Sequence, residues 1–457
     1  MLSRVVRLPL NAGGYLPLIL VFLLVSGAVK AAESPPGLPE PLTLKAALGF
    51  AREAHPALAE SLARRRRAEA RLAVAEADDN LDIRVDARLR FIDPARLALD
   101  PSSNDSGIGI LAEKRLYDAG RAASAIQGAR QILASRELEF VDGQRQRYLD
   151  ILAAYFDVLL ADLTYIRDNE AMSVQFVRLD KQRNRHELGQ VSDLMLTRAE
   201  DDYQRVRARR AVSELNQRLA RQRLASLLNR PDSLPSDLEM PEVRLGDRSA
   251  PDFEQLLARA LENNPRLLAM RRRLAAAVAA VDEARNVYGP EVSARLRAGA
   301  WRRDTGSRHP LSVELSLTVP LHTGGRRSAA IAEARAEVSL ARARLAGYRL
   351  RLREQLLERV LAISRLKVEL ERQLALADRT DLELDQSRAL YEMEVNSDLG
   401  DAMVNVSAAR LEASRAGFDL ALAWLGLMVL TGEDLDEKRI EALLAGDIGP
   451  LATASAE

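Results

Sequence analysis

Residues Leu44 to Leu58 read LKAALGFAREAHPAL, and residues Phe253 to Leu267 read FEQLLARALENNPRL. Both stretches begin with a helical pattern of apolar residues, and both reach a polar residue followed by proline, His55-Pro56 in the first and Asn264-Pro265 in the second. The two stretches lie 209 residues apart. The same helix start therefore occurs twice, which indicates an internal duplication.

Three further pairs of segments repeat at nearly the same separation. They are VDARLR at 85–90 with VSARLR at 292–297, LYDAGR at 116–121 with LHTGGR at 321–326, and VSDL at 191–194 with NSDL at 396–399. Their separations are 207, 205 and 205 residues. A register that drifts by so little is typical of duplication rather than chance.

Within each half the periodicity of the apolar residues changes in the same order. The first structural repeat, residues 33–230, is predicted to hold helices over about 43–79, 121–187 and 192–228 and strands over about 82–92 and 107–116. The second, residues 253–432, is predicted to hold helices over about 253–286, 326–391 and 398–430 and strands over about 291–301 and 311–320. A linker, residues 231–252, joins them, and residues 433–457 form a C-terminal tail. The predicted fold class is mainly α with a small β contribution, in duplicated helix, strand, strand, long helix, helix halves.

The predicted strands have one apolar and one polar face. In Leu311 to Val319 every odd-numbered residue is Leu or Val, and the residues between them are Ser, Glu and Thr. Residues 82–91 and 291–301 alternate in the same way, with arginines in the polar row. Such alternation fits a membrane β-barrel, in which lipid-facing and lumen-facing residues alternate. The residues assigned to the barrel lumen are Arg84, Arg88, Arg90, Arg295, Arg297 and Glu314.

Four strands are too few to close a barrel in lipid, where strand edges must be paired and about eight strands form the smallest bacterial barrel. Several chains must therefore share one barrel. Two chains would give about eight strands, whose interior side chains fill, whereas three would give about twelve, with room for a lumen. A conduit through outer membrane lipid favours three chains.

The two longest predicted helices exceed what a globular core requires, since residues 121–187 and 326–391 would each span about 100 Å. Ile331, Val338, Leu345 and Leu352 are spaced by sevens, which predicts coiled-coil packing. The shorter helices of each half together match one long helix. We therefore expect them to stack end to end beside it.

Residues 1–32 have the pattern of a secretory signal peptide. Arg4 and Arg7 precede the apolar run 16–25, and small residues follow up to Ala31 and Ala32. This run is about half the roughly 20 residues that a membrane-spanning helix needs. We expect residues 1–32 to be removed on export. Charges interrupt every later apolar stretch, so no transmembrane helix is predicted there.

Composition excludes several classes of protein. The 66 basic and 66 acidic side chains balance, which argues against a nucleic-acid binder. The absence of cysteine excludes disulfides, thiolate metal sites and a cysteine nucleophile. The four histidines lie far apart, and no cluster of catalytic residue types stands out. No catalytic, cofactor or metal site is assigned, and the chain is not expected to be an enzyme.

Glycines stand where each predicted strand pair leads into a long helix. Gly120, Gly324 and Gly325 allow a positive φ at this turn, and Arg121 and Arg326 follow at the start of the helices. No lysine or serine of a phosphate-binding loop follows these glycines, so a strand-to-helix turn is the favoured interpretation.

The repeated motifs resemble those of the TolC-type outer membrane efflux proteins, over essentially the whole exported chain. The similarity rests on the His-Pro and Asn-Pro turns, LYDAGR and LHTGGR, the segment AYFDVLL at 154–160 and the turn at 189–194. It implies a homotrimer with a twelve-stranded β-barrel in the outer membrane of a Gram-negative bacterium, continuous with an α-helical barrel in the periplasm. It also implies an inner-membrane pump and a periplasmic adaptor (membrane fusion) protein as partners, in a tripartite efflux or type I secretion system that exports small molecules, metal ions or proteins.

The same resemblance points to a constriction at the periplasmic end. In the family, rings of aspartates after the second hairpin narrow the entrance, and the matching residues here are Asp398 and Asp401, with Gly400 where another aspartate is expected. Their spacing of three puts both on one helix face. The alternative is that Asp398 only stabilises a helix N-terminus.

A function of another class stays open: a periplasmic coiled-coil scaffold or adaptor without a pore. Lys114 falls in the apolar row of residues 107–116, and few aromatic residues are available for the membrane interfaces, with Phe91, Tyr117, Tyr288 and Trp301 as the candidates. Solubility without detergent would favour the scaffold.

Overall fold

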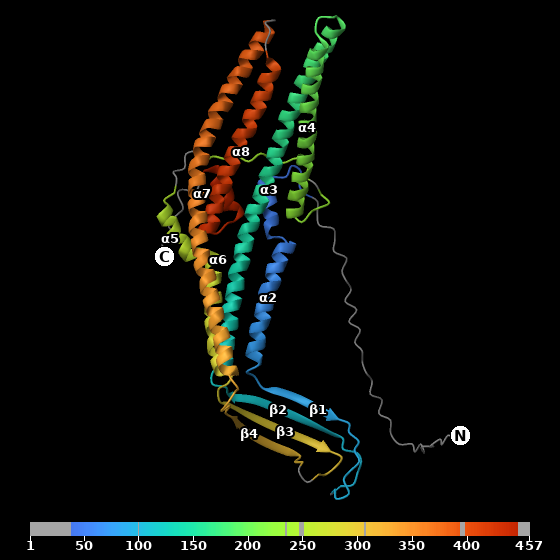
Figure 1. Cartoon of the computed structure of the whole chain (residues 1–457), viewed down its shortest axis with the longest axis vertical. Helices are drawn as coiled ribbons and strands as arrows, with labels where there is room; N and C mark the ends of the chain where they lie inside the picture. Colours follow the sequence, from blue (N-terminus) through green and yellow to red (C-terminus); the bar gives the residue numbers. More distant parts are fainter. Residues whose placement is uncertain are drawn as a thin grey trace, which may run out of the picture. The chain divides into compact units, whose positions relative to one another are not determined.

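The computed structural model describes residues 38–98, 100–233, 235–245, 251–305, 308–393 and 398–446. The predicted signal peptide, residues 1–32, lies outside the described residues, as do 394–397 and the C-terminal tail from 447 onwards. Along the described chain, helices and strands follow in an order that occurs twice (Figure 1).

The first half contains two short helical segments and three longer helices, namely α1 (Leu44–Gly49), η1 (Phe50–Arg52), α2 (Pro56–Ala77), α3 (Arg121–Glu187) and α4 (Asp193–Leu227). The prediction of one helix over 43–79 is wrong, because the backbone at His55 is extended and a new helix begins at Pro56. The His55 ring accepts a hydrogen bond from the backbone N–H of Ala57 at 3.2 Å. Proline fits the first turn of a helix but not its interior, which explains the break.

The second half repeats this plan with α5 (Phe253–Asn263), α6 (Pro265–Asn286), α7 (Arg326–Glu392), α8 (Leu399–Thr431) and an added α9 (Glu437–Ala445). The prediction of one helix over 253–286 is wrong for the same reason. Asn264 caps α6, and its side chain accepts a hydrogen bond from the backbone N–H of Leu267 at 2.8 Å.

Four strands form one antiparallel sheet in the order β1-β2-β3-β4. They are β1 (Asp82–Arg88), β2 (Gly107–Tyr117), β3 (Glu291–Trp301) and β4 (Leu311–Thr318). Because β2 pairs with β3, the sheet joins the two halves, and β1 and β4 lie at its edges. β1 ends at Arg88, short of the predicted 92, and an isolated bridge follows between Phe91 and Asn104.

The helices of the two halves are also in contact. α3 packs against α2 and α4 of its own half and against α6 and α8 of the second half. α7 packs against α5, α6 and α8. α6 and α8 therefore each contact both long helices.

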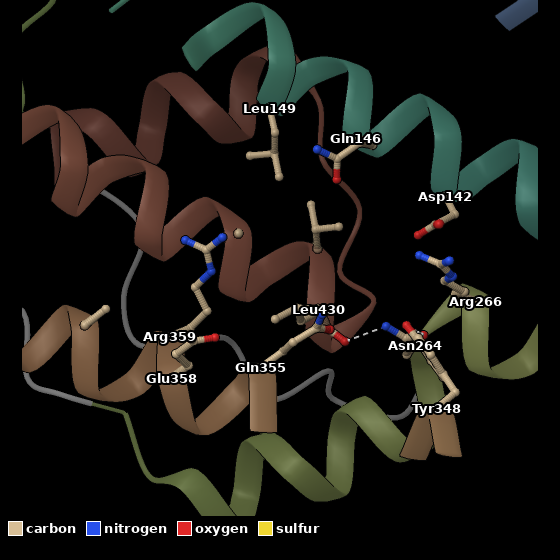
Figure 2. A pocket seen from close by; sticks show the side chains of 13 residues that line it. Asp142, Gln146, Leu149, Asn264, Arg266, Tyr348, Gln355, Glu358, Arg359 and Leu430 are labelled. Atoms are coloured by element: carbon tan, nitrogen blue, oxygen red, sulfur yellow. Dashed lines mark hydrogen bonds between the residues drawn. The ribbon is translucent and has the colours of Figure 1, made fainter. Parts of the chain in front are cut away.

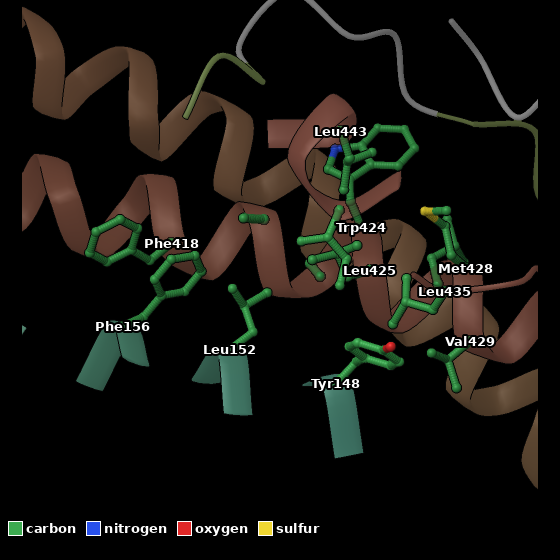
Figure 3. Close-up of a cluster of buried hydrophobic side chains, with 14 of the residues drawn as sticks. Tyr148, Leu152, Phe156, Phe418, Trp424, Leu425, Met428, Val429, Leu435 and Leu443 are labelled. Atoms are coloured by element: carbon green, nitrogen blue, oxygen red, sulfur yellow. The ribbon is translucent and has the colours of Figure 1, made fainter. Parts of the chain in front are cut away.

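The apolar core lies where α3 meets α8, and residues of α7 and α9 extend it. Figure 3 shows Leu152 and Phe156 of α3 directed toward α8. The rings of Phe156 and Phe418 stack with centroids 4.1 Å apart. The Tyr155 hydroxyl lies 2.8 Å from the carbonyl oxygen of Leu42 and 2.6 Å from that of Glu239, so the linker is fixed to α3.

Among the described residues, α8 has the length and apolar composition of a membrane-crossing helix. As expected from the sequence, charges interrupt its apolar stretch, at Arg415 and Asp419. In addition, 67% of its most apolar 18-residue stretch is buried within the protein, which is the arrangement of a core helix.

Candidate pore-lining site

The register of the sheet separates apolar from polar residues. On one face Val85, Ile110, Ala298 and Leu311 follow one another across the four strands. The apolar face is open to its surroundings, with Val313 77% and Leu315 70% exposed. An apolar surface of this extent needs lipid or another protein to cover it.

Lys114 lies in the apolar row, and it is placed at the end of the sheet next to the helices. Its ammonium group donates to the backbone carbonyl of Asp79, just beyond α2. A charge on the lipid face costs least near the membrane interface. This position is therefore compatible with a lipid-facing sheet.

The opposite face carries a network of charged groups. Arg295 donates to Glu113 of β2 at 2.9 Å and to Glu314 of β4 at 3.2 Å, which links three strands. Arg84 lies 3.8 Å from Asp82 and 3.7 Å from Asp86 on its own strand. In the described part of the chain, Arg88 and Arg297 have no ion-pair partner.

Arg90, predicted to line the lumen from a strand, lies beyond the end of β1. Its guanidinium is 3.5 Å from the carboxylate of Asp105, which is only 4% exposed. Arg308 donates to both oxygens of the same carboxylate at 2.7 and 3.2 Å. These ion pairs fasten together the two loops at the end of the sheet away from the helices.

Trp301 is one of the aromatic residues predicted from the sequence as candidates for the membrane interface, but the sheet does not place it among the apolar residues. It lies in the row of Arg295 and Arg297, on the polar face. A Cβ atom at Gly107, directly opposite, would lie 2.2 Å from the Trp301 ring. Glycine at 107 therefore makes room for the indole. The alternation in residues 291–301 could have shown that Trp301 lies on the polar face, since it falls in the same alternate row as Arg295 and Arg297.

The strand-to-helix turns adopt left-handed backbone conformations. Gly120 has φ 86°, and Gly324 and Gly325 have φ 58° and 84°. Arg121 lies 3.8 Å from Glu291 of β3, whereas Arg326 donates to the carbonyl oxygen of Thr323 at 3.2 Å. The turns are thus held by local polar contacts.

The two aspartates assigned to the constriction have different surroundings. Asp398 is the N-cap residue of α8, but its side chain makes no capping hydrogen bond. Asp401, in the first turn of α8, pairs with Arg178 of α3. Further along α8, Ser407 donates to Glu170 of α3. Arg178 was missed by sequence reasoning, because nothing local marks a contact between residues so far apart in the chain.

A cavity of 540 Å³ opens between α3, α7, α8 and the turn that joins α5 to α6 (Figure 2). Burial raises the pKa of Asp142 on its wall, against the opposing effect of Arg266. Tyr348 donates to the Asn264 side chain at 3.2 Å. These contacts join the helices, and they do not place a nucleophile beside a base.

Within the described ranges, no group of three or more His, Asp or Glu side chains is arranged to hold a metal ion. The polar groups of the sheet and of α8 are instead spread along surfaces. Charged groups spread in this way set the electrostatic potential along the surface that carries them.

Comparison with known proteins agrees with this geometry. Residues 256–433 match the model of the family described as outer membrane efflux protein. Protein CyaE of Bordetella pertussis is 28% identical over 237 residues, which is 49% of this chain and 48% of that protein. The chain thus spans about half the length of this curated relative.

Solved structures extend the similarity of fold to most of the chain. The CmeC outer membrane channel of Campylobacter jejuni has a TM-score of 0.71 at 14% identity, covering 96% of this chain and 98% of that one. A membrane protein from Pseudomonas aeruginosa has a TM-score of 0.69 at 21% identity, covering 85% and 93%. The outer membrane protein VceC of Vibrio cholerae has a TM-score of 0.66 at 18% identity, covering 85% and 96%.

The chain therefore has the fold of these outer membrane proteins. The resemblance of this chain to the outer membrane efflux protein family is confirmed by the family match together with that fold.

Proposed function

We propose that this chain is an outer membrane channel of a tripartite efflux or type I secretion system. Three copies form a twelve-stranded barrel in the outer membrane, joined to a helical barrel in the periplasm. The channel docks through a periplasmic adaptor to an inner-membrane pump, and it exports small molecules, metal ions or proteins.

The sheet is the observation that carries this proposal. One face is apolar and exposed, the other holds a charged network, and both edges lie open at β1 and β4. Open edges are not viable in lipid. Closure with other copies satisfies the edges and turns the charged face toward a water-filled lumen.

The charged face then becomes the lumen wall. Arg84, Arg295 and Glu314 form ion pairs along it, whereas Arg88 and Arg297 are without such partners among the described strands. Arg90 belongs to the loop cluster around Asp105 and lies at the mouth of the barrel.

The narrow end is proposed to lie at the start of α8, where Asp398 and Asp401 project. Because Asp401 pairs with Arg178, its charge is partly offset. Asp398 therefore contributes more of the negative potential at the entrance than Asp401 does, and the entrance favours cations.

The test is purification with and without detergent, followed by mass measurement and planar-bilayer recording. A detergent-dependent assembly of three exported chains that conducts ions is expected. The other candidate, a periplasmic scaffold without a pore, would be a stable protein in plain buffer that gives no conductance, and this result would overturn the channel.

A further inference from the structure

The polar face of the sheet carries one large aromatic side chain, Trp301, and its indole rests on glycines. A Cβ at Gly107 would be 2.2 Å from the Cδ1 atom of the indole, and a Cβ at Gly299 would be 2.9 Å from its Cη2 atom. These two atoms belong to opposite ends of the ring system, so the indole lies flat against the strands. Glycine inside a strand often marks a place where another group approaches the backbone closely.

The other face of the indole is turned away from the sheet. The guanidinium of Arg308 lies 5.9 Å from the ring centroid, which is close to the outer limit of a cation–π contact. That guanidinium is already held by Asp105, to which it donates at 2.7 and 3.2 Å. Trp301 is partly exposed. A flat aromatic ring can therefore stack on this face of the indole.

Beside the indole, no side chain covers the backbone at Gly109. A Cβ built there would meet the Ala298 carbonyl oxygen at 3.2 Å and the Gly299 Cα at 3.7 Å, and no described side chain lies within 4 Å of it. We call this space the Gly109 hollow. Gly109 lies opposite Gly299, two residues before Trp301 on β3. Trp301 is thus a diagonal neighbour, about 7–8 Å away and within reach of the hollow.

Two arginines are diagonal neighbours of the same hollow. Arg88 of β1 lies opposite Gly107, two residues before Gly109. Arg297 of β3 lies opposite Leu111, two residues after Gly109. Both arginines are exposed, and in the described part of the chain neither has an ion-pair partner. Their long side chains can reach the hollow from two sides.

The acids of this face do not neutralise the two arginines. Asp86, opposite Gly109, lies 3.7 Å from Arg84 and is engaged there. The other acids of the four strands' polar face lie in one row nearer to the helices, together with Arg295: Asp82, Glu113 and Glu314. The surroundings of the Gly109 hollow are therefore left with an excess of positive charge.

We propose that the Gly109 hollow binds planar aromatic carboxylates, with the ring stacked on Trp301 and the carboxylate between Arg88 and Arg297. This inference rests on the proposed channel, in which this face is the lumen wall, and it adds a class of solute that the wall recognises. The indole selects a flat ring, and the guanidinium groups select an oxyanion. An aromatic cation or an aliphatic carboxylate satisfies only one of these requirements. Binding is expected to be weak, because a solute in transit must also leave.

Binding of 2-naphthoate to the detergent-purified protein tests the site. Equilibrium dialysis, with protein-free detergent as the blank, should give saturable binding of one 2-naphthoate per chain. Two matched probes separate ring from charge: 2-naphthylmethylamine has the ring with a positive charge, and cyclohexanecarboxylate has the carboxylate without a π system. Both should bind at least about fivefold more weakly, the lower end of what stacking on an aromatic side chain contributes. Equal binding of either probe would overturn the proposal.

Replacement of the indole tests its role in binding. Trp301→Leu should weaken the binding of 2-naphthoate by about 5- to 150-fold, because the stacking surface is lost. The matched control is Phe91→Leu. This residue is also aromatic and exposed, but alternation places it in the apolar row, so its loss should leave binding unchanged. Equal loss in both variants would contradict a site on the polar face.

Replacement of the arginines tests the site without disturbing the sheet, because both are exposed and unpaired in the described chain. Arg88→Gln and Arg297→Gln should each weaken binding about two- to fivefold, as expected for exposed charge pairs. Arg66→Gln, a change at an exposed arginine of α2, should have no effect. If both sheet variants bind 2-naphthoate as tightly as the wild type, the assignment of the carboxylate position is wrong.

Recording in planar bilayers separates this inference from the proposed function. 2-Naphthoate should lower the single-channel current of the wild type, and it should lower that of the Trp301→Leu variant less. A protein that conducts but does not bind 2-naphthoate overturns the site and leaves the channel in place. A protein that binds 2-naphthoate at Trp301 without conducting supports the site and overturns the channel.

Discussion

The helices α4 and α8 are the equivalent helices of the two halves, since each begins within a copy of the Ser-Asp-Leu motif, yet their environments are opposite. α8 packs against both α3 and α7, and its side chains fill the core. α4 packs against α3 through polar contacts such as Arg221 with Asp162, and it buries only a few apolar side chains, among them Val206 and Leu224. The duplicated segments keep their length and helical form, while their position in the fold determines how apolar they are.

The largest expected effect compares equivalent leucines of the two helices. Leu420→Ala in α8 removes a fully buried side chain, whereas Leu215→Ala in α4 changes one that is 63% exposed. The first should lower the free energy of unfolding by about 2–5 kcal/mol and the second by less than about 0.5 kcal/mol. Denaturation of the two variants side by side measures the difference. Equal losses would mean that another copy covers Leu215.

A smaller effect is expected where α4 holds α3 through charge. Arg221 donates to both oxygens of Asp162 at 2.6 and 2.9 Å, and it is only 16% exposed. Arg221→Ala should cost about 1–3 kcal/mol of unfolding free energy. Arg218→Ala is the matched change, because the Arg218 side chain also forms an ion pair but is 72% exposed. It should cost at most about 1 kcal/mol. If the two variants have the same stability, polar contacts do not hold α4 in place.

At the start of α8 the expected change is in conductance rather than stability. If the proposed constriction lies here, Asp398→Ala with Asp401→Ala should raise the single-channel conductance and lower the cation preference, because the change removes carboxylates from it. If the aspartates only stabilise the helix N-terminus, conductance stays the same and stability falls by about 0.5–2 kcal/mol. Planar-bilayer recording together with thermal melting separates the two outcomes.

The smallest effect concerns pH at the α3 side of the cavity. Burial raises the pKa of Asp142, so its contribution to stability is present at low pH and is lost as pH rises through that value. Asp142→Asn cannot ionise. The variant should therefore gain stability relative to the wild type as pH rises above about 4. A difference in melting temperature that does not vary with pH would contradict this assignment.

Sequence reasoning found the elements whose pattern is strong and local. The helix over 121–187 follows from sustained periodicity, and the strands follow from alternation. The breaks at His55 and Asn264 were misjudged although both precede a proline, because the apolar pattern continues across the turn. In β1 the pattern runs past Arg88, but β2 begins only at Gly107, and residues 90–92 form hydrogen bonds with residues 103–105 of the loop instead.

The candidate site was harder to predict from the sequence, because its contacts join residues that are far apart in the chain. Alternation assigns Arg295 to the polar face, but it cannot show that Glu113 and Glu314 flank it from two different strands. In the same way, nothing around Asp401 indicates Arg178, and nothing around Asp105 indicates Arg308. Long flexible side chains select such partners only after the backbone is placed.

The indole of Trp301 above Gly107 has a practical consequence for spectroscopy. The chain has two tryptophans, and the other, Trp424, is buried in α8. Replacing one leaves the other as a single intrinsic fluorophore. Trp301 reports on the end of the sheet away from the helices, where an aqueous quencher has access, and Trp424 reports on the helical core, where it has little. Without any attached dye, the protein thus offers separate optical signals for its two regions.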